Sequence, residues 1–149
     1  YYKDKWFPYT MPISDIYGLR TALENVKADS QIHQRHADIA AAVRTAVQAA
    51  GLKLYLKQGY CPTVTVIEVP EGVDSAELLE LMDKKYQVMI AGCFDILAGK
   101  VIRLGHMGEN ANVPDVTLML DALDNTFADL GYLLQASMKA IFQQEIYKK

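Results

Sequence analysis

The sequence predicts an α+β fold, with a small three- to four-stranded mainly antiparallel sheet that is covered by helices on one face. Short segments rich in β-branched residues occur between helical patterns, which indicates a mixed structure. Two helical patterns precede the first strand, and strands also follow one another without a helix between them. This order differs from the strict strand–helix–strand rhythm of a doubly wound parallel sheet.

The composition is that of a folded chain with a sizeable core. Of 149 residues, 51% are hydrophobic and 22% are charged, and the net charge is −3. The sequence has no basic stripe with interleaved aromatic residues, no apolar run of membrane-spanning length and no secretory leader, so we expect neither nucleic acid nor a membrane as partner. Two cysteines do not make a disulfide framework, which favours a reduced, cytoplasmic location. The first residue is Tyr1 rather than methionine, which is typical of part of a longer polypeptide.

Two helices are expected before the sheet. The first begins near Pro12, where Thr10 is a candidate cap, and is interrupted at Asp29 and Ser30. The second ends at Gly51, a typical C-terminal signal. Apolar residues recur at three- and four-residue steps in both patterns: Ile13, Ile16, Leu19, Leu23 and Val26 in the first, and Ile32, Ile39, Val43, Val47 and Ala50 in the second.

Four strands and three further helices follow. The strands are expected at residues 52–56, 63–69, 88–91 and 101–104. Asp74 and Glu77 form a capping box for a helix that ends near Tyr86. Asn112 opens the next helix, which stops at Gly131, and a last amphipathic stretch covers residues 133–146.

Arg103 is the residue with the clearest chemical meaning. It lies in the strand of residues 101–104, just before the turn that Gly105 and Gly108 predict, so it is expected near a strand end where ligands are commonly bound. Its planar guanidinium can bind a carboxylate through two parallel hydrogen bonds. The alternative is an arginine that pairs with a carboxylate of its own chain.

Three histidines offer weaker signals. His33 and His36 have a spacing that occurs in metal sites, but no third ligand is placed by the sequence. His36 falls on the apolar stripe of its helix, which favours a core or interface histidine, and no metal site is predicted. His106 lies in the turn after Arg103 and has no evident orienting partner for proton transfer, so it is interpreted as a residue that shapes the turn.

The start of the helix near Pro12 is a possible phosphate-binding end. Helix N-termini offer free N–H groups and a partial positive charge, and Thr10 adds a hydroxyl, with Tyr9 beside it. The same features describe any capped helix, so both interpretations stay open on these residues alone.

Two segments together resemble the class V, fold type I, pyridoxal-phosphate-dependent aminotransferases. They are PYTMPISDIYGLRTAL (residues 8–23) and GKVIRLGHMG (residues 99–108). The similarity is strongest to the alanine–glyoxylate, serine–glyoxylate and pyridoxamine–pyruvate group. The intervening segments follow the order of the family, so the resemblance covers nearly the whole chain.

The resemblance implies that residues 1–30 are a lead-in segment and interdomain helix, and that residues 31–149 are the C-terminal small domain. It implies that Arg103 binds the α-carboxylate of the substrate, and that Thr10 contacts the phosphate of pyridoxal 5'-phosphate across a homodimer. Some members have a phosphate-binding tyrosine three residues before that threonine. Here the residue is Phe7, so Tyr9 is a candidate substitute.

The same resemblance places the Schiff-base lysine, the aspartate on the pyridine nitrogen and the stacking aromatic in a large domain without counterpart in these residues. No catalytic residue is therefore assigned here, and the chain alone is expected to be inactive. The leading interpretation is the C-terminal part of a transaminase that moves an amino group between a small amino acid and glyoxylate or pyruvate. The alternatives are a stand-alone α+β module that binds small carboxylates or a protein partner, and another branch of the superfamily such as a cysteine desulfurase.

Overall fold

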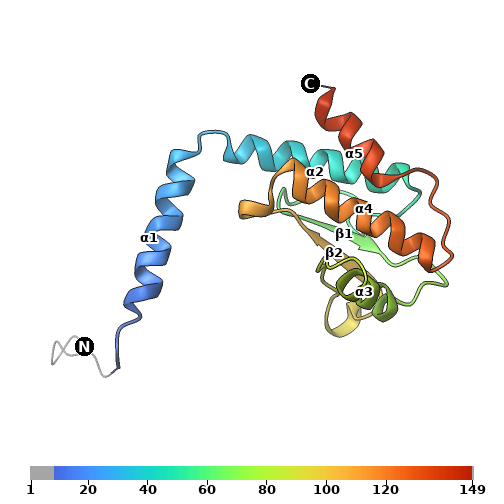
Figure 1. The fold of residues 1–149 in the computed structure, drawn as a ribbon, viewed down its shortest axis with the longest axis horizontal. Helices are drawn as coiled ribbons and strands as arrows, with labels where there is room; N and C mark the ends of the chain where they lie inside the picture. The colour runs from blue at the N-terminus through green and yellow to red at the C-terminus, as the bar shows by residue number, and fades with distance from the viewer. Residues whose placement is uncertain (1–8, 149) are drawn as a thin grey trace. The chain divides into compact units, whose positions relative to one another are not determined.

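The computed structural model describes residues 9–148, and the chain divides into two compact units between His33 and Gln34. The first unit contains α1 (Ile13–Ala28). The second unit holds most of α2 and all later elements (Figure 1). In chain order these are α2 (Ile32–Ala49), β1 (Val64–Glu68), α3 (Ser75–Lys84), the 3-10 helix η1 (Asp95–Leu97), β2 (Val101–Gly105), the 3-10 helix η2 (Gly108–Asn110), α4 (Val113–Asp129) and α5 (Met138–Tyr147).

Helix α1 matches the first predicted helix, but its expected cap is wrong. The N-cap residue is Pro12, and no side chain of residues 9–148 caps the helix. A capping oxygen has to sit on the N-cap residue itself to reach the N–H groups of the first turn, and Thr10 lies two residues earlier. No residue of α1 is buried, and its apolar side chains are exposed.

The sheet of the second unit has two strands rather than three or four. Strands β1 and β2 pair antiparallel, and Val66 lies opposite Arg103. The two other expected strands are reduced to single bridges at Leu54 and Ala91, one on each side of the pair. Among the residues described, each segment makes only two backbone hydrogen bonds with its neighbouring strand, between residues 53–55 and β1 and between Ala91 and Arg103, which is too few for a continuous ladder. The α+β class is nevertheless confirmed.

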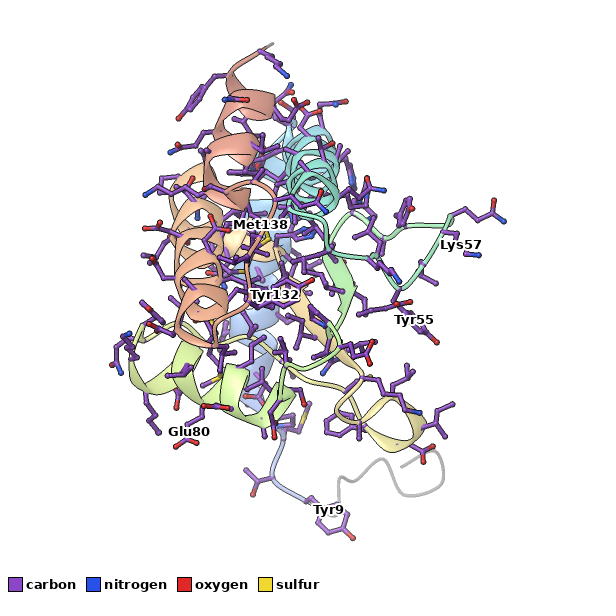
Figure 2. All side chains as sticks on the ribbon, turned by 90° about the vertical axis from the view of Figure 1, so that its right-hand side faces the viewer. Tyr9, Tyr55, Lys57, Glu80, Tyr132 and Met138 are labelled. Atoms are coloured by element: carbon purple, nitrogen blue, oxygen red, sulfur yellow. The ribbon has the colours of Figure 1, made fainter. Side chains whose placement is uncertain are left out.

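One face of the sheet is covered by helices, as predicted. Helices α2, α4 and α5 lie on the same side of the strands (Figure 1), and α3 packs against α4. Figure 2 shows Tyr132 and Met138 between the helices and the sheet, whereas Tyr55 and Lys57 project outward from the loop before β1. The largest fully buried side chains are Phe127, Phe142, Ile39, Ile67, Leu78, Met82, Ile102, Leu104, Leu120, Leu123, Met138 and His106.

Two of the predicted helix starts are confirmed by their caps, and one is wrong. Asp74 accepts hydrogen bonds from the first turn of α3, and Asn112 accepts one from the first turn of α4. Helix α5 begins at Met138 instead of residue 133. The N–H of Gln135 donates to the carbonyl of Ala50, which holds this segment outside a helix, and Ser137 then caps α5.

Within residues 9–148, no helix has both the length and the apolar character needed to cross a lipid bilayer.

Candidate functional site

The site is built around Arg103, which lies on the sheet face turned away from the helices. Side chains alternate between the two faces of a strand, and residues paired across strands share a face. Ile102 and Leu104 are fully buried on the helix-covered face, opposite Ile67 and Thr65. Arg103, one residue out of phase with both, therefore faces outward and is only partly buried.

The guanidinium of Arg103 is held at one nitrogen and open at the other two. Its Nε donates a hydrogen bond of 2.8 Å to the carbonyl oxygen of Gly92. In the described part of the chain, no carboxylate pairs with this side chain and no group accepts from its Nη1 or Nη2. The ion-pair alternative thus has no partner among residues 9–148, and two coplanar donors are available to a ligand.

The loop that follows Ala91 makes up the rest of this surface, and its contribution was not predicted from the sequence. Ala91 and Arg103 exchange backbone hydrogen bonds of 2.7 and 3.3 Å, which places Gly92 beside the Arg103 side chain. The guanidinium carbon lies 5.8 Å from the centre of the Phe94 ring. The only signal in the sequence was the glycine-bearing loop itself, because a backbone carbonyl acceptor has no sequence pattern.

Two histidines fix the turn that leaves β2. His106 is fully buried, and its Nε2 lies 2.9 Å from the hydroxyl of Thr65 on β1. Burial is the main effect and lowers the pKa of His106. Electrostatic interactions with Arg44 and His36 lower it further, whereas backbone hydrogen bonds act in the opposite direction. His36 on α2 accepts a hydrogen bond of 3.2 Å at its Nε2 from the N–H of Gly108. The interpretations of His36 as a core residue and of His106 as a residue that shapes the turn agree with these positions.

The structure places no metal site near these residues. No group of three histidine, cysteine, aspartate or glutamate side chains among residues 9–148 is arranged to hold a metal ion. His33 is exposed, and the Nε2 of His36 is occupied as an acceptor by Gly108. The pair with metal-like spacing therefore lacks a ligand set in the described chain.

Thr10 belongs to the first unit and is exposed just before α1. Among residues 9–148 no side chain caps α1, and the N–H of Ile13 at its start donates to the carbonyl of Met11 at 2.8 Å. Tyr9 is also exposed, and Phe7 lies outside the described residues. The Thr10 hydroxyl and the further N–H groups of the first turn are donors of a kind that suits an anion, and the first turn also contains the carboxylate of Asp15.

Comparison with known proteins identifies the family. No family model matches the chain. It is 34% identical over 128 residues to the small subunit of a soluble hydrogenase from Synechococcus sp., covering 84% of this chain and 33% of that protein. It is 39% identical over 108 residues to a serine–glyoxylate aminotransferase from Methylorubrum extorquens, and this match covers 70% of this chain and 27% of that protein. The crystal structure of pyridoxamine–pyruvate aminotransferase from Mesorhizobium loti superimposes with a TM-score of 0.87 at 30% identity. The match covers 96% of this chain and 38% of that one.

The chain belongs to the class V aminotransferases. It matches their C-terminal small domain and spans about a third of the length of the curated relatives it matches. Further relatives include an L-aspartate–glyoxylate aminotransferase from Paracoccus denitrificans, at 32% identity over 99% of this chain and 38% of that protein.

The residues present fit the part of the cofactor that the family resemblance assigns to them. Class V aminotransferases use pyridoxal phosphate, and phosphate oxygens accept hydrogen bonds from hydroxyl groups and from helix N-termini. The exposed hydroxyl of Thr10 and the uncapped first turn of α1 are donors of this kind. The resemblance places the contacts to the cofactor ring in the large domain.

Proposed function

We propose that this chain is the C-terminal small domain of a pyridoxal-phosphate-dependent transaminase that moves an amino group between a small amino acid and glyoxylate or pyruvate. The observation that carries the proposal is the pair of terminal nitrogens of Arg103, which have no acceptor among the described residues. The names of the relatives, which include serine–glyoxylate and pyridoxamine–pyruvate enzymes, support this substrate class.

Arg103 supplies recognition and orientation. An amino acid and an oxo acid share an α-carboxylate, so one guanidinium serves both halves of the exchange. Two parallel hydrogen bonds fix the carboxylate plane, and hence the direction of the reacting carbon, which lowers the entropic part of the barrier. The bound cofactor supplies an electron sink for the carbanionic character that develops at that carbon.

The function test replaces Arg103 in the complete enzyme that contains this chain. Arg103→Lys keeps the charge but loses the planar pair of donors, so we expect kcat/KM for the oxo acid to fall about 10- to 30-fold. Steady-state kinetics with glyoxylate and pyruvate measure this. Arg20→Lys on α1, whose side chain is exposed and pairs with Glu24, is the matched control. Unchanged kcat/KM in Arg103→Lys would remove Arg103 from substrate binding.

We also propose that Thr10 contacts the cofactor phosphate. Thr10→Val removes the hydroxyl at nearly constant size, and a hydrogen bond to a charged group contributes about 1.5–3 kcal/mol. We therefore expect the cofactor dissociation constant to rise about tenfold or more, as measured by equilibrium titration of the apoenzyme. Thr21→Val, at an exposed threonine within α1, should leave the dissociation constant unchanged. Equal affinities in the two variants would contradict the assignment.

The assembly and location follow from the same proposal. We propose a homodimer, in which Thr10 of one subunit reaches the cofactor of the other, and a large domain of the same enzyme that covers apolar side chains of α1. Ile13, Ile16, Leu19, Leu23 and Val26 are all about half exposed or more, which supports a covering partner. A cytoplasmic enzyme suits the two free cysteines, Cys61 and Cys93.

A further inference from the structure

Phe94 is an exposed aromatic residue with one defined polar contact. The residue is 79% exposed, which is unusual for a phenylalanine in a folded chain. The guanidinium carbon of Arg103 lies over its ring at 5.8 Å from the centre, within the range of a cation–π interaction. The ring thus contacts the same group that is proposed to bind the substrate carboxylate.

The loop that carries Phe94 is closed by its own hydrogen bonds. The N–H of Leu97 donates to the carbonyl of Phe94, and the N–H of Ala98 donates to that of Asp95. Asp95 adopts φ 54°, a left-handed conformation that non-glycine residues rarely take. Strained residues of this type persist where the surrounding structure fixes them, and they cluster at functional sites. The two hydrogen bonds and the conformation of Asp95 together define the backbone next to Phe94.

The loop also determines how a ligand can approach Arg103. The carbonyl of Gly92 occupies Nε at 2.8 Å, and the Phe94 ring lies against the guanidinium. No described residue accepts from Nη1 or Nη2, so the edge that these two nitrogens form is open to an incoming acceptor. A carboxylate presents two oxygens in a plane, which matches two parallel N–H groups.

We propose that Phe94 is a positioning residue for Arg103: with the Gly92 carbonyl, it orients the guanidinium so that a planar carboxylate binds at Nη1 and Nη2. This inference rests on the proposed function. Phe94 acts through Arg103 and not on the reacting atoms. The geometry gives the ring its role through its π face, and an aliphatic side chain of similar bulk does not replace it.

The test compares variants of the complete enzyme by kinetics and by inhibition with propionate, a carboxylate that cannot react. Phe94→Leu keeps an apolar side chain without a π face, and should raise both the KM for the oxo acid and the inhibition constant of propionate. A cation–π contact at an exposed site predicts an increase of roughly two- to fivefold. The kcat value should stay within about twofold, and Phe94→Trp should restore the wild-type constants. Ile96→Ala, at a residue that is 75% exposed in the same loop, is the control and should change nothing.

A second comparison separates this inference from the proposed function. In an Arg103→Gln background the cation is absent, so Phe94→Leu should add no further loss. If Arg103→Gln itself left KM and propionate inhibition unchanged, the proposed function would fail. If Arg103→Gln weakened both but Phe94→Leu behaved as wild type, only the role of Phe94 would be overturned. The role of Phe94 would also be overturned if Phe94→Trp raised KM and the inhibition constant of propionate as much as Phe94→Leu does, since the π face would then be irrelevant.

Discussion

Replacement of Phe127 by alanine is expected to lower the free energy of unfolding of this chain by about 3–5 kcal/mol. Phe127 lies on the buried side of α4 with no exposed surface, and its ring centre is 5.4 Å from that of Tyr132. Removal of the ring takes away buried apolar area and leaves a cavity that the neighbouring helices fill only in part. Urea unfolding followed by circular dichroism measures the loss.

The same helix supplies the control for this prediction. Leu118 is 59% exposed on the solvent side of α4, so Leu118→Ala should change the free energy of unfolding by no more than about 0.5 kcal/mol. Similar losses in the two variants would mean that the helical layer is not packed on the sheet as described. A loss of about 3–5 kcal/mol is a large share of the total stability of a domain.

Acidification from about pH 7.5 to about pH 5.5 is expected to destabilise the chain through His106. Burial, reinforced by Arg44 and His36, lowers the pKa of His106 from its ordinary value of 6.5. Above that value the imidazole is neutral in both states. As the pH falls below it, the unfolded chain takes up a proton that the folded chain does not, so stability decreases. The decrease is at most about 1.4 kcal/mol per pH unit, until the lowered pKa of the folded state is passed.

The variant that checks this is His106→Gln, whose amide can still bond to the hydroxyl of Thr65 but does not titrate. The free energy of unfolding should be measured across this pH range, where most carboxylates stay ionised. The loss on acidification should be smaller in His106→Gln than in the wild type. Equal losses would assign the acid sensitivity to groups other than His106.

Local signals in the sequence were sufficient for much of the fold. Asp74 and Asn112 each act within one turn of their own position, so the starts of α3 and α4 could be predicted. The start of α5 depends on contacts across the fold. Gln135 binds the carbonyl of Ala50, and Asp124 accepts hydrogen bonds from Ser137 and Met138. A periodic apolar pattern contains no information on such contacts, which is why the helix was predicted five residues too early.

In the candidate site, too, one residue could be predicted from local sequence and the others depend on contacts across the fold. Arg103 could be recognised because a charged residue between apolar neighbours in a strand must face away from the core. The carbonyl of Gly92 and the ring of Phe94 could not, because their roles depend on the bridge between Ala91 and Arg103. The contact between His106 and Thr65 joins residues 41 positions apart, and only the antiparallel register brings them together.

That register determines how the chain tolerates insertions and deletions in its two strands. A slip of one residue between β1 and β2 exchanges the two faces of a strand, and would turn Arg103 into the apolar interior in place of Ile102 or Leu104. An unpaired charge there costs several kcal/mol, so the misaligned sheet is penalised before any ligand is present. The register that buries Ile102 and Leu104 is therefore also the one that leaves Arg103 on the outer face. Insertions or deletions within Val64–Glu68 or Val101–Gly105 should abolish both the fold and this exposure of Arg103, whereas substitutions that preserve the alternation of buried and outward-facing residues should retain both.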